Sequence, residues 1–212
     1  MALEALARNG HNLHIGEFPV EGKYDIPALK PVLLSECINW LPFNCAKTER
    51  NRSAHGIHFF VDDYLFERVW KDPARYALLL SEFRAVMTPD FSLFTDYPFP
   101  VQLYNHWRKH LLGAYWQRMG MTVIPSICWS DESSFDWCFD GEPAGGTVAV
   151  SSVGTQKNPN ARQLFQLGYS EMLRRLKPEK ILFFGDMPEN CKGNLEHHPA
   201  YYAALAHARK KR

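Results

Sequence analysis

The sequence has little of what would assign a function directly. Its 212 residues contain no Cys-x-x-Cys pair, and its five cysteines are an odd number. No stretch approaches the roughly 18 apolar residues that a membrane-spanning helix needs. The net charge is only +1, so no overall field attracts nucleic acid or an anionic membrane. With no secretory signal in view, we expect a cytoplasmic protein with free thiols and no membrane partner.

Common enzyme signatures are missing as well. The chain has no Walker loop and no Gly-x-Gly-x-x-Gly motif, and no Gly-x-Ser-x-Gly elbow surrounds Ser130. Internal repeats and low-complexity segments are absent. With 46% hydrophobic and 22% charged residues, the composition is that of an ordinary globular protein. The length suffices for one well-cored domain.

Composition changes along the chain predict three regions. Glycine and proline interrupt the first of these, which indicates an N-terminal arm at residues 1–38 that drapes over a core. The α/β core domain is expected at residues 39–190. Residues 191–212 are expected to form a loop, a short helix at residues 201–209 and a basic tail.

The most informative feature that is present is a polar or acidic group at the end of each short apolar run. Runs at residues 58–61, 85–89, 122–129, 147–150 and 181–184 stop on Asp62-Asp63, Asp90, Ser130-Asp131, Ser151-Ser152 and Gly185-Asp186. Segments with helical periodicity separate these runs. Alternating short strands and helices predict βα units and a parallel sheet.

The intervening segments carry the usual signals of helix ends. Helices are expected from Tyr64 (N-cap Asp62 or Asp63), from Asp72-Pro73, and at residues 100–119 (ended by Gly120), 131–139 (capped by Ser130) and 160–176. A closed eight-stranded barrel usually needs about 250 residues. We therefore predict an α/β fold whose parallel sheet has about five to seven strands and is open or incompletely barrel-like.

The carboxyl ends of parallel strands face one rim of the sheet, where ligands bind. That rim would collect the catalytic candidates Asp90, Asp63 and Asp186. Asp90 is predicted to act as a general base or nucleophile, because neighbouring carboxylates raise its pKa. The alternative is that Asp90 only caps a turn. Of Asp62 and Asp63, one faces the site, because adjacent strand residues point in opposite directions.

Other residues near this rim are predicted to bind substrate. Trp129 at a strand end can stack on a flat ligand, although ordinary packing explains it equally well. The turn at residues 151–155 offers hydroxyls near a helix N-terminus, which suits phosphate or carboxylate. Arg108 can clamp an anion, with a structural ion pair as the favoured alternative. The predicted substrate-binding set is Asp62, Ser92, Asn105, Arg108, Trp129, Ser130, Asp131, Ser151, Ser152, Thr155 and Gly185.

No metal ligand and no cofactor is assigned from the sequence. A divalent cation between Asp90 and Asp62 or Asp63 is chemically conceivable, but no metal-binding loop accompanies these residues. His55 and His58 have no cysteine pair nearby, and strand or loop geometry would separate their rings.

Several motifs, taken in order, resemble an uncharacterised domain-of-unknown-function family found in phages, plasmids and bacterial genomes. The motifs are His58-Phe59-Phe60-Val61-Asp62-Asp63, Thr88-Pro89-Asp90-Phe91-Ser92, Gly113-Ala114-Tyr115-Trp116-Gln117, Val123-Ile124-Pro125 through Trp129-Ser130-Asp131, and Ser151-Ser152-Val153-Gly154. They span roughly residues 40–186, most of the chain. The resemblance implies no established activity that can be transferred.

The order of the strand ends is also distantly similar to barrel enzymes of the tRNA-guanine transglycosylase type. Those enzymes exchange a base in nucleic acid by means of two aspartates at strand ends. The similarity implies Asp90, with Asp131 or Asp186, as counterparts. The present chain is shorter and lacks the zinc-ligand cysteine pattern of that family.

Two functions follow from these observations. The first is an enzyme that acts on a nucleotide or nucleic-acid base at the carboxylate-rich rim. The second is a non-catalytic accessory protein of a phage or other mobile element, which binds nucleic acid or a protein partner through basic residues such as Lys109 and Arg209 to Arg212. The rim carboxylates and the low net charge weigh against the second. An unpaired edge strand would permit a homodimer in either case.

Overall fold

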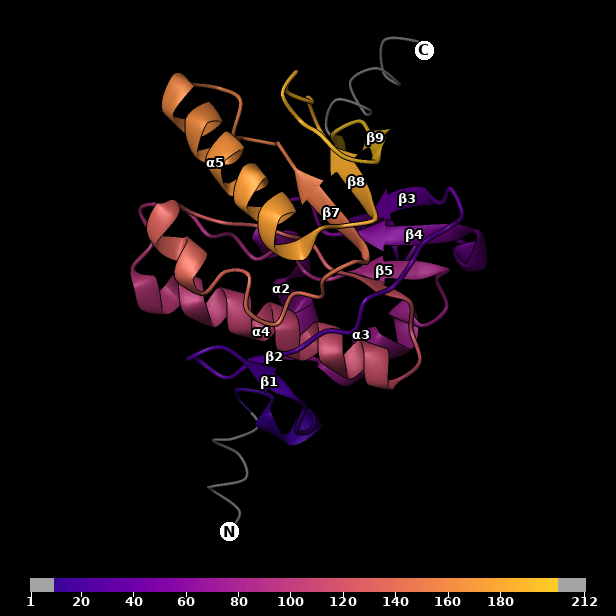
Figure 1. Ribbon diagram of the computed structural model, residues 1–212. Helices are drawn as coiled ribbons and strands as arrows, with labels where there is room; N and C mark the ends of the chain where they lie inside the picture. Colours follow the sequence, from indigo (N-terminus) through magenta and orange to yellow (C-terminus); the bar gives the residue numbers. More distant parts are fainter. Residues whose placement is uncertain (1–9, 202–212) are drawn as a thin grey trace.

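The computed structural model describes residues 10–201, which form an α/β fold (Figure 1). The 3-10 turns are η1 (Leu13–Ile15), η2 (Phe43–Cys45), η3 (Arg52–Ala54) and η4 (Glu132–Asp136), and the α-helices are α2 (Asp63–Lys71), α3 (Pro73–Leu80), α4 (Phe99–Arg118) and α5 (Pro159–Leu176). The strands are β1 (Val20–Glu21), β2 (Ile26–Pro27), β3 (Asn39–Pro42), β4 (His55–His58), β5 (Ala85–Met87), β6 (Val123–Ile124), β7 (Thr147–Ser151), β8 (Lys180–Phe184) and β9 (Leu195–His198).

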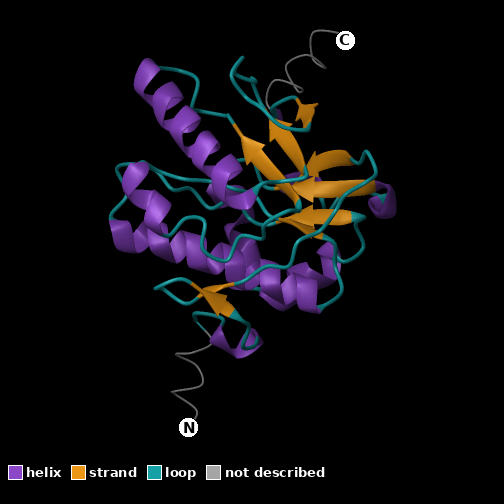
Figure 2. Cartoon of the chain, in the orientation of Figure 1, coloured by secondary structure: helices purple, strands orange, loops and turns teal. Residues whose placement is uncertain are grey.

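The parallel strands form two sheets. Strands β3 to β6 lie side by side in chain order, and β7 to β9 form the second sheet. One parallel bridge, between Ser126 after β6 and Ala149 of β7, links the sheets. Figure 2 shows these parallel strands gathered together, with helices along the left and lower sides and the short β1–β2 hairpin apart from them at the bottom. The α/β prediction with parallel strands is confirmed, and among residues 10–201 the strands do not close into a barrel.

Strand β8 illustrates how a short apolar run becomes a strand that is buried on both faces. Successive side chains of a strand point to opposite faces. Ile181 and Phe183 pack in one hydrophobic cluster with side chains of α5. Leu182 and Phe184 belong to another cluster, which contains side chains of β4, β5, α2 and α4. Apolar residues without alternation are typical of such doubly covered parallel strands.

Local signals set the helix ends as expected. The Asp72 side chain accepts a hydrogen bond of 3.2 Å from the Arg75 amide, and Pro73 is the first residue of α3. Gly120 follows α4 with a φ of 84°, a left-handed conformation that glycine adopts without strain. At the start of α5, the Asn158 side chain accepts an amide hydrogen bond of 2.8 Å.

The helix predicted at residues 131–139 is instead the short 3-10 turn η4. Its N-cap is Asp131 rather than Ser130, because the Asp131 side chain accepts a hydrogen bond of 3.0 Å from the Ser133 amide. Serine and aspartate side chains bond readily to nearby backbone groups and so compete with a regular helix. The helix predicted at residues 201–209 lies outside the described residues, apart from Tyr201, and so does the basic tail.

Strands also form where none was predicted. β9 pairs in parallel with β8, although the segment after Asp186 was expected to be a polar loop. β1 and β2 form an antiparallel hairpin within the expected arm, and β2 packs against α4. These strands are short and mostly not apolar, so their partners rather than their own pattern hold them extended. The division into an arm, a core and a C-terminal region stays a prediction.

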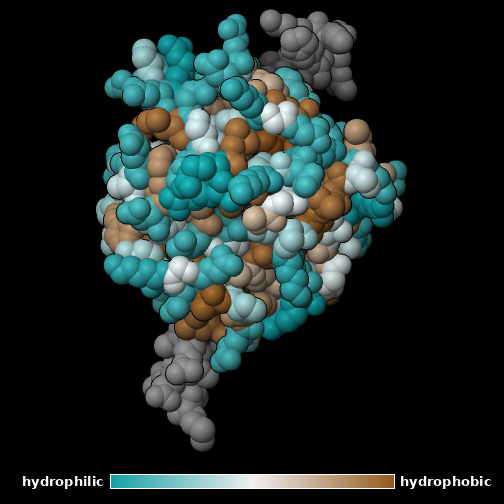
Figure 3. Space-filling view, in the orientation of Figure 1, coloured by the Kyte–Doolittle hydropathy of each residue, from teal (hydrophilic) through white to brown (hydrophobic). Residues whose placement is uncertain are grey.

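The surface is mixed in character. The face shown in Figure 3 is largely hydrophilic, with apolar side chains in separate patches. No helix between residues 10 and 201 has the length and apolar character to cross a membrane. The five cysteines, all within the described range, are unpaired, as predicted.

Gly168 of α5 lets the Trp129 indole lie directly against the helix. A Cβ at this position would come within 2.2 Å of Trp129 Nε1. We expect Gly168→Ala to lower the free energy of unfolding by about 1–3 kcal/mol through overpacking. At an unobstructed helix position the same change would raise it by up to about 1 kcal/mol. Urea unfolding measures the difference, with the exposed Ser170→Ala of the same helix as the control. A Gly168→Ala protein more stable than wild type would contradict this contact.

Candidate functional site

Asp63 and Ser92 connect two neighbouring strand ends. Asp63 begins α2 after β4, and Ser92 lies in the turn after β5. Asp63 Oδ2 accepts a hydrogen bond of 3.0 Å from the Ser92 amide, and Oδ1 accepts one of 2.8 Å from the Ser92 hydroxyl. Burial raises the pKa of Asp63, although both bonds from Ser92 oppose the rise. The carboxylate therefore holds the turn that follows β5.

Asn105 and Arg108 of α4 extend this network. Asn105 Nδ2 donates to the Ser92 carbonyl oxygen at 2.8 Å, and Arg108 Nε donates to Asn105 Oδ1 at 3.0 Å. Arg108 Nη1 pairs with Glu67 Oε1 at 2.9 Å, and the guanidinium lies 3.5 Å from the centre of the Phe91 ring. The structure thus brings Asp63, Ser92, Asn105 and Arg108 together. It also gives Arg108 the structural ion pair that was the favoured alternative for this residue.

Asp90 is partly buried, and one of its carboxylate oxygens is shielded from solvent. Its Oδ1 is buried and has no hydrogen-bond partner among the described residues. Burial raises the pKa of Asp90 to about 7; the positive charge of Lys109 opposes the rise and the Asp63 carboxylate adds to it. A carboxyl with this pKa changes charge near neutral pH, which is what general acid–base chemistry requires.

Lys109 and Glu142 form an ion pair inside the protein. Their side chains are 1% and 0% exposed, and Lys109 Nζ lies 2.6 Å from Glu142 Oε1. Lys109 also donates to the Ser126 carbonyl oxygen at 3.0 Å. Burial alone would lower the pKa of Lys109 and raise that of Glu142, but their attraction reverses both shifts. The prediction that Lys109 is exposed for nucleic-acid binding is therefore wrong, because the β1–β2 hairpin and the loop that carries Glu142 cover this part of α4.

Two buried histidines of α4 lie beside Glu142. His110 Nε2 is 3.0 Å from Glu142 Oε1, and His110 Nδ1 is 2.9 Å from the Pro27 carbonyl oxygen. His106 Nε2 is 3.0 Å from the Asp140 carbonyl oxygen, and burial lowers the pKa of His106 well below its usual range. One nitrogen or oxygen atom from each of His106, His110 and Glu142 lies within 4.8 Å of the others. This is the group in the described chain that can hold a metal ion.

The predicted residues after β7 and β8 form a separate group. Ser152 Oγ donates to the Asp186 carbonyl oxygen at 2.7 Å, and Thr155 Oγ1 donates to the Ser152 carbonyl oxygen at 2.8 Å. Gly185 has a φ of 98°, and a Cβ there would lie 2.7 Å from Ser152 Oγ. Ser151 Oγ accepts a hydrogen bond of 3.2 Å from the Val153 amide. The hydrogen bonds of these residues mainly stabilise two adjacent turns.

The remaining predicted residues occupy structural positions. Trp129 Nε1 donates to the Leu164 carbonyl oxygen at 3.2 Å, and its ring packs on Phe165 of α5. Ser130 is buried next to the η4 turn that Asp131 caps. Asp62 is the exposed residue before α2. A substrate-binding role for these residues stays a prediction.

His110, Glu142 and Glu67 were not predicted as site residues. The four-residue spacing of His106 and His110 could have indicated this pair from the sequence, since residues four apart share one face of a helix. Nothing local marks Glu142, which follows His110 by 32 residues and lies in a loop. Glu67 reads from sequence as one more surface charge of an amphipathic helix.

Comparisons place this chain beside known proteins. Residues 18–201 match the family described as Domain of unknown function (DUF4417). The chain is 39% identical over 175 residues to the "Gene 1 protein" of Mycobacterium phage D29, a match that covers 79% of this chain and 63% of that protein. It is 39% identical over 173 residues to the "Gene 1 protein" of Mycobacterium phage L5, a match that covers 80% of this chain and 75% of that protein. The match therefore spans less than two thirds of the D29 protein. No solved structure matches the chain.

The Lys109–Glu142 pair gives a stability prediction. Lys109→Met keeps an unbranched side chain but leaves the Glu142 charge uncompensated in the interior. We expect the free energy of unfolding to fall by about 3–5 kcal/mol, as it does when one partner of a buried pair is removed. Urea unfolding at neutral pH measures this, and adding Glu142→Gln to Lys109→Met should recover part of the loss. Unchanged stability of the single variant would show that the pair is not buried.

Proposed function

This chain belongs to the DUF4417 family, and from that premise we propose that it is an enzyme whose acid–base group is Asp90. The reaction site lies at the carboxyl ends of β4 and β5, where Asp63 and Asp90 follow the strands. The proposed substrate is a nucleotide or a nucleic-acid base. The observation that carries the proposal is the Asp90 carboxyl, whose pKa burial raises to about 7.

The surroundings of Asp90 support a role in proton transfer. Burial makes ionisation of the Asp90 carboxyl costly to the fold, and the Lys109 charge and a hydrogen bond from Cys128 offset only part of that cost. Lys109 supplies a positive charge that stabilises the ionised Asp90 carboxylate, which is the form that accepts a proton. Asp90 is therefore the base, and Lys109 acts on it through the electrostatic field.

The turn that carries Asp90 is held in place from two sides. Asp63 of α2 binds the amide and hydroxyl of Ser92, and Asn105 of α4 binds the Ser92 carbonyl oxygen. Arg108 fixes Asn105 in turn. Such support keeps a reacting group in one orientation, which is a requirement of an efficient site. In this proposal, Asp63, Ser92, Asn105 and Arg108 position Asp90.

In this proposal, the loop at residues 91–98, which directly follows Asp90, moves when substrate binds. The loop carries Phe94, which is 56% exposed. Loops that close over a site are common in enzymes, because they exclude water during the reaction. An exposed aromatic ring at the loop is also a suitable surface for a planar base.

The turn after β7 supports the choice of a phosphate-containing substrate. A Cβ at Gly154 would meet nothing within 4 Å, so a ligand can approach the backbone there. Ser151 Oγ accepts from the Val153 amide, and its own hydrogen remains available to donate. Backbone amides and hydroxyls in a glycine-containing turn suit an anionic group. Asp186, exposed after β8, is the carboxylate beside this second turn.

Asp90→Asn tests the enzyme proposal in a thermal-shift screen against nucleotides, nucleobases and divalent metals. A ligand at about a hundred times its dissociation constant adds roughly 2.7 kcal/mol. In a domain of this size that raises the melting temperature by roughly 5–10 °C. We expect a nucleotide or nucleobase to produce this shift with wild type and with the exposed control Asp136→Asn, but not with Asp90→Asn. If the ligand raises the melting temperature of Asp90→Asn as much as that of wild type, Asp90 is not part of the binding site.

The pH dependence of stability provides a second test of Asp90, with the same variant. The folded-state pKa of Asp90 lies above its usual value near 3.8, so ionisation costs stability as the pH rises through about 7. Asp90→Asn should therefore match wild type near pH 4 and be more stable above about pH 8, by up to roughly 4 kcal/mol. For an Asp90 base, the reaction rate of wild type should rise with pH around a midpoint near 7.

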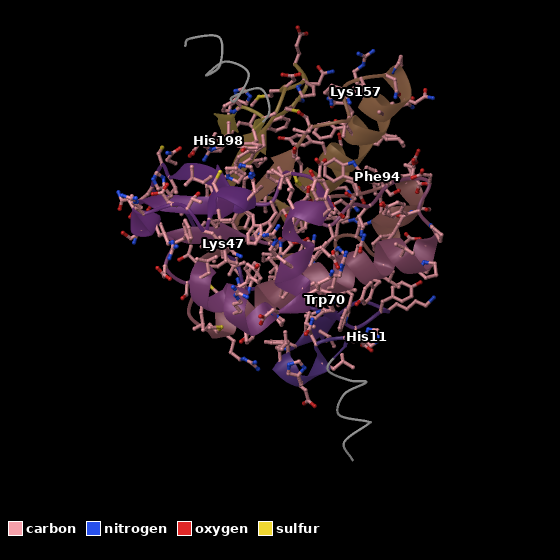
Figure 4. All side chains as sticks on the ribbon, turned by 180° about the vertical axis from the view of Figure 1, so that it is seen from behind. His11, Lys47, Trp70, Phe94, Lys157 and His198 are labelled. Carbon is pink, nitrogen blue, oxygen red and sulfur yellow. The ribbon has the colours of Figure 1, made fainter. Side chains whose placement is uncertain are left out.

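A second candidate function, binding of nucleic acid, is favoured by a different feature. Lys47, Arg52 and Arg75 line a cavity of about 320 Å³ beside Tyr76. Arg52 is paired with Glu82 at 2.8 Å, while Lys47 and Arg75 lie over the Tyr76 ring, at 5.5 Å and 6.0 Å from its centre. Cations at the rim of a cavity suit the phosphate groups of a nucleic acid. Lys47 and Phe94 lie on opposite sides of the molecule in Figure 4, so this basic cavity is distinct from the loop after Asp90.

Lys47→Ala combined with Arg75→Ala tests this second function. If the basic cavity binds a single-stranded oligonucleotide, the double variant should weaken binding at least tenfold at low salt and flatten its salt dependence. Arg68→Ala with Lys71→Ala removes the same charge from the exposed end of α2 and is the matched control. Fluorescence anisotropy measures both. Equal losses of affinity in the two double variants would show that net charge alone explains the effect, and would exclude the cavity as the binding site.

A further inference from the structure

His106 and His110 lie one turn apart on α4 and are both fully buried. Residues at this spacing project from the same face of a helix. A carbonyl oxygen can only accept a hydrogen bond, so each histidine nitrogen that faces one must carry the proton. This assigns the proton of His106 to Nε2, which faces the Asp140 carbonyl, and that of His110 to Nδ1, which faces the Pro27 carbonyl.

Each ring thereby keeps its other nitrogen for a second partner. His106 Nδ1 is buried and has no hydrogen-bond partner among the described residues. His110 Nε2 lies 3.0 Å from Glu142 Oε1, so it donates a hydrogen bond to the carboxylate when it carries a proton and is a ligand position beside that carboxylate when it does not. A histidine whose far N–H is held by a backbone carbonyl is the usual arrangement of a metal ligand.

Glu142 completes the set. Lys109 occupies Oε1, whereas Oε2 is buried and has no partner in the described part of the chain. One carboxylate oxygen therefore serves the lysine and the other remains for a second cation. Lys109 repels an incoming cation, but His106 Nδ1 and Glu142 Oε2 are both buried without a partner in the described part of the chain, and His110 Nε2 lies beside the same carboxylate.

We propose that His106, His110 and Glu142 bind a divalent first-row transition-metal ion of the zinc class. The three donor groups lie within 4.8 Å of one another, close enough to converge on one ion. Two imidazoles and one carboxylate match the preference of zinc and similar ions for nitrogen and oxygen donors. Three protein ligands leave a further coordination position, as in catalytic zinc sites. The proposal differs from the sequence analysis, which assigned no metal ligand, and it is independent of the role proposed for Asp90.

Titration of the chelator-treated full chain with Co²⁺ tests the site, with visible absorption as the readout and Zn²⁺ as the competitor. We expect one Co²⁺ per chain, displaced by Zn²⁺. His106→Gln and His110→Gln should each weaken binding by more than about 100-fold, since even second-shell changes cost about 10–100-fold. His14→Gln, an exposed histidine, is the matched control and should bind as wild type does.

Two results would overturn the proposal: a wild-type protein that takes up neither ion, or a folded His106→Gln variant that binds as tightly as the control. Near-UV circular dichroism establishes whether each variant is folded. If the histidine variants do not fold, X-ray absorption of the Zn²⁺-loaded wild-type chain decides. Imidazole and carboxylate ligands support the site, while sulfur ligands would assign the metal to cysteines instead.

Discussion

The Lys109–Glu142 ion pair joins parts of the chain that are far apart in sequence. Lys109 belongs to α4 and also binds the Ser126 carbonyl after β6, while Glu142 lies in the loop after η4. Through His110, the same cluster reaches β2 of the N-terminal hairpin. Because both charges are fully buried, removing either partner leaves an uncompensated charge in the interior. The positions of α4, the hairpin and the Glu142 loop therefore depend on one another.

This cluster also sets the electrostatics of the neighbouring strand ends. Asp90 experiences the positive charge of Lys109 and the negative charge of Asp63, while burial raises its pKa to about 7. On the other side, Glu142 is shared between Lys109 and His110. The proposed proton site at Asp90 and the proposed metal site at His106 and His110 are thus linked through Lys109 and Glu142. A substitution of Lys109 changes the electrostatic potential at both Asp90 and the histidines, so the two proposals need separate tests.

Local patterns predicted the elements well where caps and apolar runs were strong. Asp72-Pro73 begins α3, Gly120 follows α4, and the runs at residues 147–150 and 181–184 form β7 and β8. Predictions failed where a partner segment supplies the stabilisation. β9 has no apolar alternation of its own and is held by its hydrogen bonds to β8, and η4 replaced a full helix because Asp131 and its serines bond to nearby backbone.

The sequence by itself determined the α/β class and the parallel strands, because strand and helix periodicity and cap residues act over a few positions. It also placed Asp63, Asp90, Ser92, Asn105 and Arg108 near one strand end, where the structure brings most of them together. Only the tertiary structure decided that Lys109 is buried and that Glu142 meets His106 and His110. Burial and charge pairing are properties of segments distant along the chain, so no local pattern records them.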